Sequence, residues 1–211
     1  MKYPHAHSGV KKIFIGALLE VISSALMIAV TILLIYFSNL TDVSATLTLV
    51  ASIVSVVAFI FQLIGLFQAR KDEGSFSGAL WSIFLVIIIT IAQIPLSYLT
   101  GDWVTYVTSS ADAVKSLLSI AVIMYILSGI SNLAGSLGES GYASRGRIIR
   151  VLLMIVFLAA LGMRLVSAFV KGSEQLNNVM GYIAIGSSAV ELVANIWYFF
   201  YLARAPKKLS K

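Results

Sequence analysis

Long apolar runs dominate the chain, and short polar connections separate them. Six runs reach the roughly 20 residues needed to cross a bilayer. They cover residues 13–37, 45–67, 78–99, 113–137, 148–170 and 179–203. Apolar residues follow one another within these runs instead of alternating with polar ones, which predicts membrane-spanning helices and not the strands of a membrane barrel. The pattern therefore predicts an all-α integral membrane protein, with residues 1–211 forming a single bundle of six transmembrane helices.

Composition supports this class and excludes others. Hydrophobic residues make up 59% of the 211 residues and charged residues 11%, whereas a soluble domain carries about 25% charged residues. There is no cysteine, which excludes disulfides, thiolate metal sites and cysteine nucleophiles. The two histidines, His5 and His7, lie in a stretch that we expect to fray rather than to bind a metal. No catalytic pair or phosphate loop is present, so we predict no enzyme, no cofactor and no metal site.

The basic residues predict an orientation. The net charge is +6, and twelve of the fifteen Lys and Arg residues fall at the termini or in the second and fourth connections. The opposite side holds only Lys115, Arg164 and Lys171. Cytoplasmic loops collect Lys and Arg, so both termini are predicted to be cytoplasmic, in the cell membrane. No basic stripe with interleaved aromatic residues lies outside the spans, and nucleic acid is therefore not a predicted partner.

Glycines punctuate the predicted helical hairpins at a regular interval. Gly9, Gly78 and Gly146 each open a helix that runs away from the cytoplasm, and they are 69 and 68 residues apart. Gly74 and Gly141, in two inner connections, keep an offset of 67. The interval indicates three diverged hairpin repeats of about 68 residues. The alternative is that unrelated hairpins use glycine at similar places.

Apart from Lys115 and Arg150, each the third residue of its span, three charged residues fall inside the predicted spans, where a charge costs about 2.5–3.5 kcal/mol on insertion scales. Glu191 lies near the middle of its span and reaches neither interface, so it should be paired, protonated or directed into a water-filled cavity. Arg164 is its first candidate partner and Glu20 the next ionisable group. Arg164 could instead extend to the outer interface, and Glu20 could be partly hydrated near the inner one.

Uncharged polar residues complete the candidate ligand-binding or cavity-lining set. Gln93 stands two residues before Pro95, and a proline frees a carbonyl group one turn back along its helix. A free carbonyl beside a glutamine suits a binding site, and a loosened helix end is the alternative. Gln62 and Asn195 are further candidates, which could equally serve as hydrogen-bonding links between helices.

The leading functional prediction is a solute-handling protein, either a small transporter or the membrane-embedded binding subunit of one. Its predicted partners are the lipid bilayer, a small-molecule solute and another membrane subunit. In its six spans, its orientation and the spacing of Ala25 and Ala29, the chain resembles the substrate-binding S components of energy-coupling-factor vitamin transporters. That resemblance implies solute binding within the membrane but assigns no ligand-binding residue. The alternative is a non-catalytic accessory or assembly protein that packs against a partner membrane complex.

Overall fold

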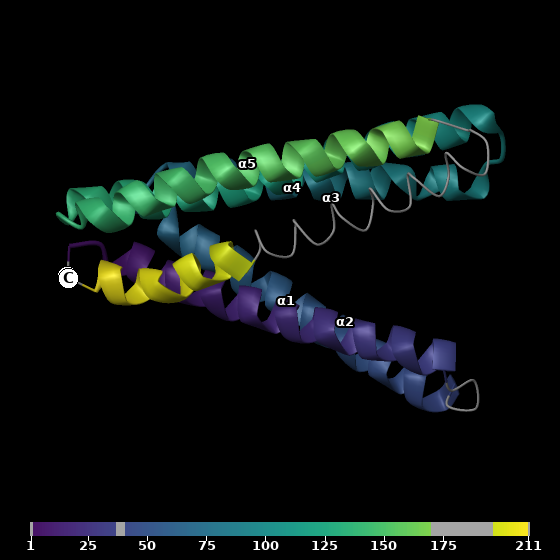
Figure 1. Ribbon diagram of the computed structural model, residues 1–211, viewed down its shortest axis with the longest axis horizontal. Coiled ribbons are helices and arrows are strands. Elements are labelled where there is room, and N and C mark those ends of the chain that lie inside the picture. The colour runs from purple at the N-terminus through teal and green to yellow at the C-terminus, as the bar shows by residue number, and fades with distance from the viewer. Residues whose placement is uncertain (1, 37–40, 170–195, 211) are drawn as a thin grey trace. The chain divides into compact units, whose positions relative to one another are not determined.

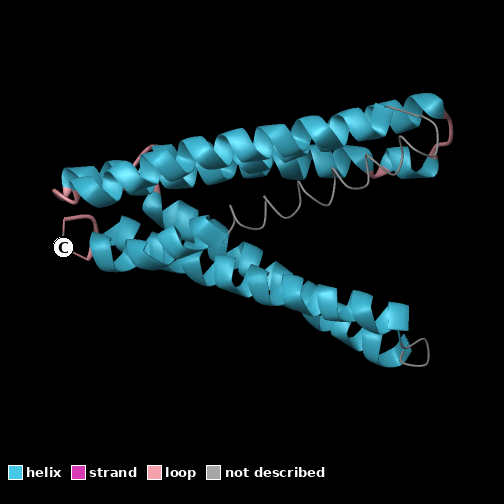
Figure 2. Cartoon of the chain, viewed as in Figure 1, coloured by secondary structure: helices cyan, strands magenta, loops and turns pink. Residues whose placement is uncertain are grey.

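The computed structural model describes residues 2–36, 41–169 and 196–210, and these are helical apart from short connections. Figures 1 and 2 show long helices, with short connections between α2 and α3, between η1 and α4 and between α4 and α5. In chain order they are α1 (Pro4–Tyr36), α2 (Thr41–Ala69), α3 (Ser75–Gln93), the short 3₁₀ helix η1 (Pro95–Tyr98), α4 (Asp102–Ser136) and α5 (Ser140–Phe169). Residues 196–209 are helical as well. The all-α prediction is confirmed for the described part of the chain.

Among the described residues, three segments are long and apolar enough to cross a membrane, namely Asp42–Ala69, Ser75–Gln93 and Tyr106–Ser136. Their large apolar side chains are widely exposed, for example Leu49 at 61% and Ile88 at 59%. Lipid accommodates such side chains, whereas in water an exposed apolar surface of this kind would cause protein molecules to associate with one another. The membrane class predicted from the sequence is supported by these three helices, while the count of six spans remains a prediction.

The chain divides into two compact units. The first contains Met1–Asp72 together with Leu202–Lys211, and we call it the α1–α2 unit. The second contains Glu73–Tyr201, and we call it the α3–α5 unit. The single six-helix bundle therefore also remains a prediction.

A seam of small residues joins α1 and α2. Its members recur every seven positions and are buried: Gly9, Gly16 and Ser23 on α1, and Ala51, Ala58 and Gly65 on α2. A Cβ added to Gly16 would lie 2.7 Å from the Ala58 carbonyl oxygen, and the Ser23 hydroxyl donates to the Ala51 carbonyl at 2.8 Å. Each step of seven along α1 is thus matched by a step of seven back along α2. Small residues let the two backbones approach closely and fix one antiparallel register.

The first turns of α1 are hydrogen-bonded to residues at and just after the C-terminal end of α2. The Ala6 backbone N–H donates to Asp72 Oδ2 at 2.7 Å, and the Ser8 hydroxyl donates to Gln68 Oε1 at 3.2 Å. A carboxylate at a helix N-terminus accepts a hydrogen bond from a backbone N–H that has no partner inside the helix. Its negative charge also interacts favourably with the positive end of the helix dipole. The expectation of a frayed start is therefore wrong, because α1 is already helical from Pro4.

Glycines also permit close helix packing in the α3–α5 unit. A Cβ on Gly78 of α3 would lie 2.7 Å from the Tyr125 ring of α4, and one on Gly129 would lie 2.7 Å from the Phe76 ring. Phe76 is fully buried by this contact with α4. Helix α4 begins at Asp102, well before the predicted start at 113. The predicted outer connection was too long because no Gly or Pro follows Gly101 to interrupt a helix.

Tyr201 anchors the last helical residues of the α3–α5 unit. Its ring stacks on Tyr142 of α5 with centroids 4.4 Å apart, and its carbonyl accepts the Tyr142 hydroxyl at 2.6 Å. Its own hydroxyl lies 3.3 Å from the Ser131 hydroxyl of α4. The ring also covers Gly146, where a side chain would collide with it. Tyr201 is 5% exposed, so it packs inside the unit.

Candidate functional site

Two residues predicted separately as site candidates meet in the α1–α2 unit. Gln62 Nε2 of α2 donates to Glu20 Oε2 of α1 at 2.7 Å. Each residue stands four positions after a seam residue, Glu20 after Gly16 and Gln62 after Ala58. The register of the seam therefore brings them together along one edge of the hairpin. Glu20 is exposed within its unit, and Gln62 is half-buried.

The two edges of this hairpin differ in chemistry. In the middle of the hairpin, positions one and four after Gly16, Ser23, Ala51 and Ala58 form, together with Thr48, a polar edge, which contains Ala17, Glu20, Ser24, Thr48, Ser52, Ser55 and Gln62. Positions just before Gly16, Ser23, Ala51, Ala58 and Gly65 and three after the first four of these form an apolar edge, which contains Ile15, Leu19, Ile22, Leu26, Val50, Val54, Val57, Phe61 and Ile64. Met27 and Phe59 interrupt the polar edge. All of these side chains are exposed or half-buried, so each edge is open to whatever surrounds the hairpin. Around Gly9 and after Gly65 this distinction is lost, because the first set of positions there holds the buried Val10, Ile13, Leu66 and Ala69 and the second set holds Ser8, Lys12 and Gln68.

The polar edge offers mainly hydrogen-bond acceptors and hydroxyl groups. The Ser52 hydroxyl donates to the Thr48 carbonyl at 2.9 Å, and the Thr48 hydroxyl donates to the Ser44 carbonyl at 2.8 Å. Such bonds within a helix let hydroxyl groups reside in an apolar medium. A carboxylate that accepts an amide hydrogen retains further lone pairs for a donor on a bound molecule. Among the described residues, no group of three or more His, Cys, Asp or Glu side chains could hold a metal ion.

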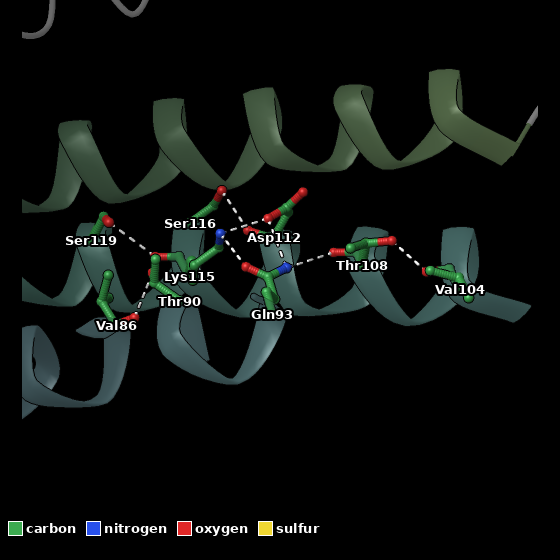
Figure 3. Close-up of polar contacts among 9 residues, drawn as sticks. All are labelled: Val86, Thr90, Gln93, Val104, Thr108, Asp112, Lys115, Ser116 and Ser119. Atoms are coloured by element: carbon green, nitrogen blue, oxygen red, sulfur yellow. Dashed lines mark hydrogen bonds and ion pairs between the residues drawn. The ribbon is translucent and has the colours of Figure 1, made fainter. Parts of the chain in front are cut away.

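A second polar cluster joins α3 to α4 (Figure 3). Lys115 Nζ donates to Gln93 Oε1 at 2.5 Å and pairs with Asp112 Oδ1 at 2.7 Å. Gln93 Nε2 donates in turn to Asp112 Oδ1 at 3.2 Å and to the Thr108 carbonyl at 3.3 Å. The two charges neutralise each other, and both ends of the amide are engaged. This arrangement suits a clamp between two helices better than an open binding site.

The proline beside Gln93 does not leave an open carbonyl group. Pro95 lacks an N–H, and the carbonyl one turn back, that of Ile91, instead accepts the Ile94 N–H at 3.1 Å. Helix α3 ends at Gln93, and η1 follows from Pro95. The prediction of a freed carbonyl as a ligand contact is therefore wrong, and the alternative of a loosened helix end describes this segment.

For the remaining predicted site residues, either the residue or its side chain is outside the part of the chain that the structure describes. Glu191 and Asn195 lie outside the described residues. Arg164 belongs to α5, and its side chain is not described. The pairing of Glu191 with Arg164 therefore stays a prediction. Asp112 and Lys115 were missed as a pair, although carboxylate and ammonium groups three residues apart are neighbours on a helix.

Comparison of the chain with protein-family models, with curated proteins and with solved structures found no match. The part of the chain that the structure describes is helical and contains three candidate membrane-spanning helices. Its α1–α2 hairpin carries a polar edge opposite an apolar one.

Proposed function

We propose that the chain is a multi-pass protein of the cell membrane, with six spans and cytoplasmic termini, that handles a small polar solute. It would act as a small transporter or as the membrane-embedded binding subunit of one. The observation that carries this proposal is the polar edge of the α1–α2 hairpin, with the Glu20–Gln62 hydrogen bond at its centre.

The position of Glu20 determines which edge of the hairpin can face lipid. A carboxylate facing lipid costs about 2.5–3.5 kcal/mol on insertion scales, and one amide hydrogen bond recovers only part of that cost. The apolar edge of the same hairpin is well suited to lipid. The free energy is therefore lowest when the apolar edge faces lipid and the polar edge faces water or polar groups inside the assembled protein. Glu20 and Gln62 would then contact a solute that carries hydrogen-bond donors.

The packing glycines support the proposed hairpin repeats. Gly9, Gly78 and Gly146 each lie at a close approach to another helix, where an added Cβ would collide with the facing atoms. Repeats that bury a glycine at equivalent places would give three similar hairpins. Three such hairpins would supply the six spans of the proposed topology.

The solute-binding proposal is tested by what the protein retains on purification. The wild-type chain and the Glu20→Gln variant are purified in a mild detergent, and small molecules that remain bound are identified by mass spectrometry. We expect Glu20→Gln to lose a molecule that the wild type retains, because the carboxylate contact is removed. Asp42→Asn, which neutralises an exposed carboxylate in the first turn of α2, should retain it. Equal retention by all three proteins would contradict the proposal.

One observation favours the alternative of an accessory protein. Ala25 and Ala29 stand four residues apart on α1, and both are exposed within the α1–α2 unit. A small-residue pair at this spacing lets another membrane helix approach closely. Under this alternative, replacing both alanines with leucine should release a co-purifying membrane protein, while Glu20→Gln should not.

A further inference from the structure

The C-terminal residues of the α1–α2 unit form a short amphipathic helix. Leu202, Ala205 and Leu209 are each 0% exposed, and they recur at spacings of three and four that place them on one helix face. Arg204 and Lys207 are exposed on the opposite side. Figure 1 shows this segment in yellow beside the purple first turns of α1, and both belong to the same compact unit. The buried face fixes the segment, and the two basic side chains point outward.

This segment adds its charges to those of the hairpin. Lys11 on α1 and Arg70 and Lys71 after α2 are exposed as well. We call these three residues, together with Arg204 and Lys207, the basic surface. Two acidic residues follow Lys71: the Asp72 carboxylate accepts the backbone N–H of Ala6, and the Glu73 carboxylate accepts the Ser75 hydroxyl and the Asn132 amide. The α1–α2 unit thus carries exposed basic side chains from three separate parts of the chain.

The basic surface lies where a membrane surface is expected. Arg70 and Lys71 follow directly after Ala69, the last residue of a candidate membrane-spanning segment. The Arg70 guanidinium lies 4.7 Å from the centre of the Phe67 ring. An aromatic ring and a basic group paired in this way are typical of the headgroup region of a bilayer. The membrane itself can therefore supply a ligand for the basic surface.

We propose that the basic surface binds the phosphate-bearing headgroups of anionic phospholipids. Juxtamembrane basic clusters attract anionic lipids, and each Lys or Arg near the surface strengthens the attraction roughly fivefold. Five exposed basic groups on a rigid scaffold should therefore enrich such lipids at this place over uncharged ones. Lipid is favoured over a soluble anion because the surface adjoins the end of a candidate span. This inference is independent of the solute proposed above.

Trp197 provides a local reporter of bound lipid. It is exposed and lies on the same helical segment seven residues before Arg204, which places it about 10 Å from Arg204 and on the same helix face. A lipid whose headgroup contacts Arg204 would bring its acyl chain close to this ring. Trp81→Phe and Trp103→Phe leave Trp197 as the single tryptophan. Quenching by phosphatidylglycerol or phosphatidylcholine with brominated chains then compares the affinities of the two lipids.

In vesicles of the two lipids, we expect the single-tryptophan protein to prefer phosphatidylglycerol several-fold. Arg204→Gln combined with Lys207→Gln should abolish most of this preference, as should 0.5 M NaCl, because salt screens exposed charges. The control combines Arg145→Gln with Arg147→Gln, which removes two exposed charges from the α3–α5 unit and should preserve the preference. Far-ultraviolet circular dichroism would confirm that all variants remain helical.

Three results would overturn the proposal. The first is equal quenching by the two lipids in the single-tryptophan protein. The second is an equal loss of preference in both double variants, which would assign the effect to total charge. The third is displacement of phosphatidylglycerol by millimolar inorganic phosphate, which would identify a site for a soluble anion.

Discussion

Replacing Gly65 with alanine tests the packing on which the candidate site depends. A Cβ at Gly65 would lie 2.6 Å from the Gly9 carbonyl oxygen and 2.7 Å from Cγ1 of Ile13. The carbonyl belongs to the α1 backbone and cannot rotate away as a side chain could. The variant must therefore push α1 and α2 apart or distort one of them.

The expected magnitude follows from two opposing terms. The contact must lengthen by about 0.8 Å to reach ordinary van der Waals distance, and overpacking of this kind costs about 1–3 kcal/mol. Alanine regains up to about 1 kcal/mol over glycine through its helix propensity. We therefore expect Gly65→Ala to destabilise the protein by about 1–2 kcal/mol. Gly16→Ala should act similarly and should also displace Gln62, whose Cγ would lie 2.6 Å from the new Cβ.

The assay is reversible unfolding in mixed detergent micelles, monitored by far-ultraviolet circular dichroism. Gly162→Ala is the matched control, because Gly162 is exposed on α5 and no described residue lies within 4 Å of its added Cβ. That variant should be neutral or more stable than the wild type. The reasoning would be refuted if Gly65→Ala were as stable as Gly162→Ala.

Further predictions concern the α3–α5 unit and the topology. Tyr142→Phe should destabilise the protein by about 0.5–1.5 kcal/mol, because it removes the hydrogen bond to the Tyr201 carbonyl. Tyr98→Phe, at a side chain that is 83% exposed, should change the unfolding free energy little, and similar effects of both variants would argue against the buried bond. Gln93→Leu should lower thermal stability relative to the wild type, because it removes the amide from both partners in the α3–α4 cluster, and an unchanged melting temperature would show that the cluster does not join the helices. In the naturally cysteine-free chain, a single cysteine at Thr100 should react with a membrane-impermeant thiol reagent in intact cells, whereas one at Ser210 should not; labelling at Ser210 would refute the proposed orientation.

The helices were predictable because long apolar runs are local features of a sequence. Their ends were less predictable. The sequence from Trp103 to Asp112 contains polar residues and was assigned to a connection, yet it contains no residue that breaks a helix, and α4 includes it. At α3 the opposite occurred: the apolar run continues to Leu99, and Pro95 ends the α-helix at Gln93. Hydropathy predicts which segments suit a membrane, while proline and glycine decide where helices begin and end.

The candidate site was predicted only as separate residues. Glu20 and Gln62 were each singled out because polar groups are costly in apolar spans, but their pairing depends on the antiparallel register of α1 and α2. That register follows from the small residues of the seam. Their seven-residue spacing is visible in the sequence, on α1 in Gly9, Gly16 and Ser23 and on α2 in Ala51, Ala58 and Gly65. Small residues at this interval indicate a seam, and extending it would have predicted the polar and apolar edges. Asp112 was assigned to a connection and Lys115 to the outer end of a span, so their cluster with Gln93 was missed.

The most direct test of the account is the environment of the two hairpin edges in a bilayer. Single cysteines at Ser24 and Ser55 report on the polar edge, and cysteines at Ile22 and Val57 report on the apolar edge. After reconstitution and spin labelling, the access of oxygen and of a water-soluble nickel chelate to each label is measured by electron paramagnetic resonance. The account predicts high oxygen access at Ile22 and Val57, and low oxygen access, or access of the chelate, at Ser24 and Ser55. Equal, lipid-like oxygen access at all four positions would contradict it, because the polar edge would then face the bilayer.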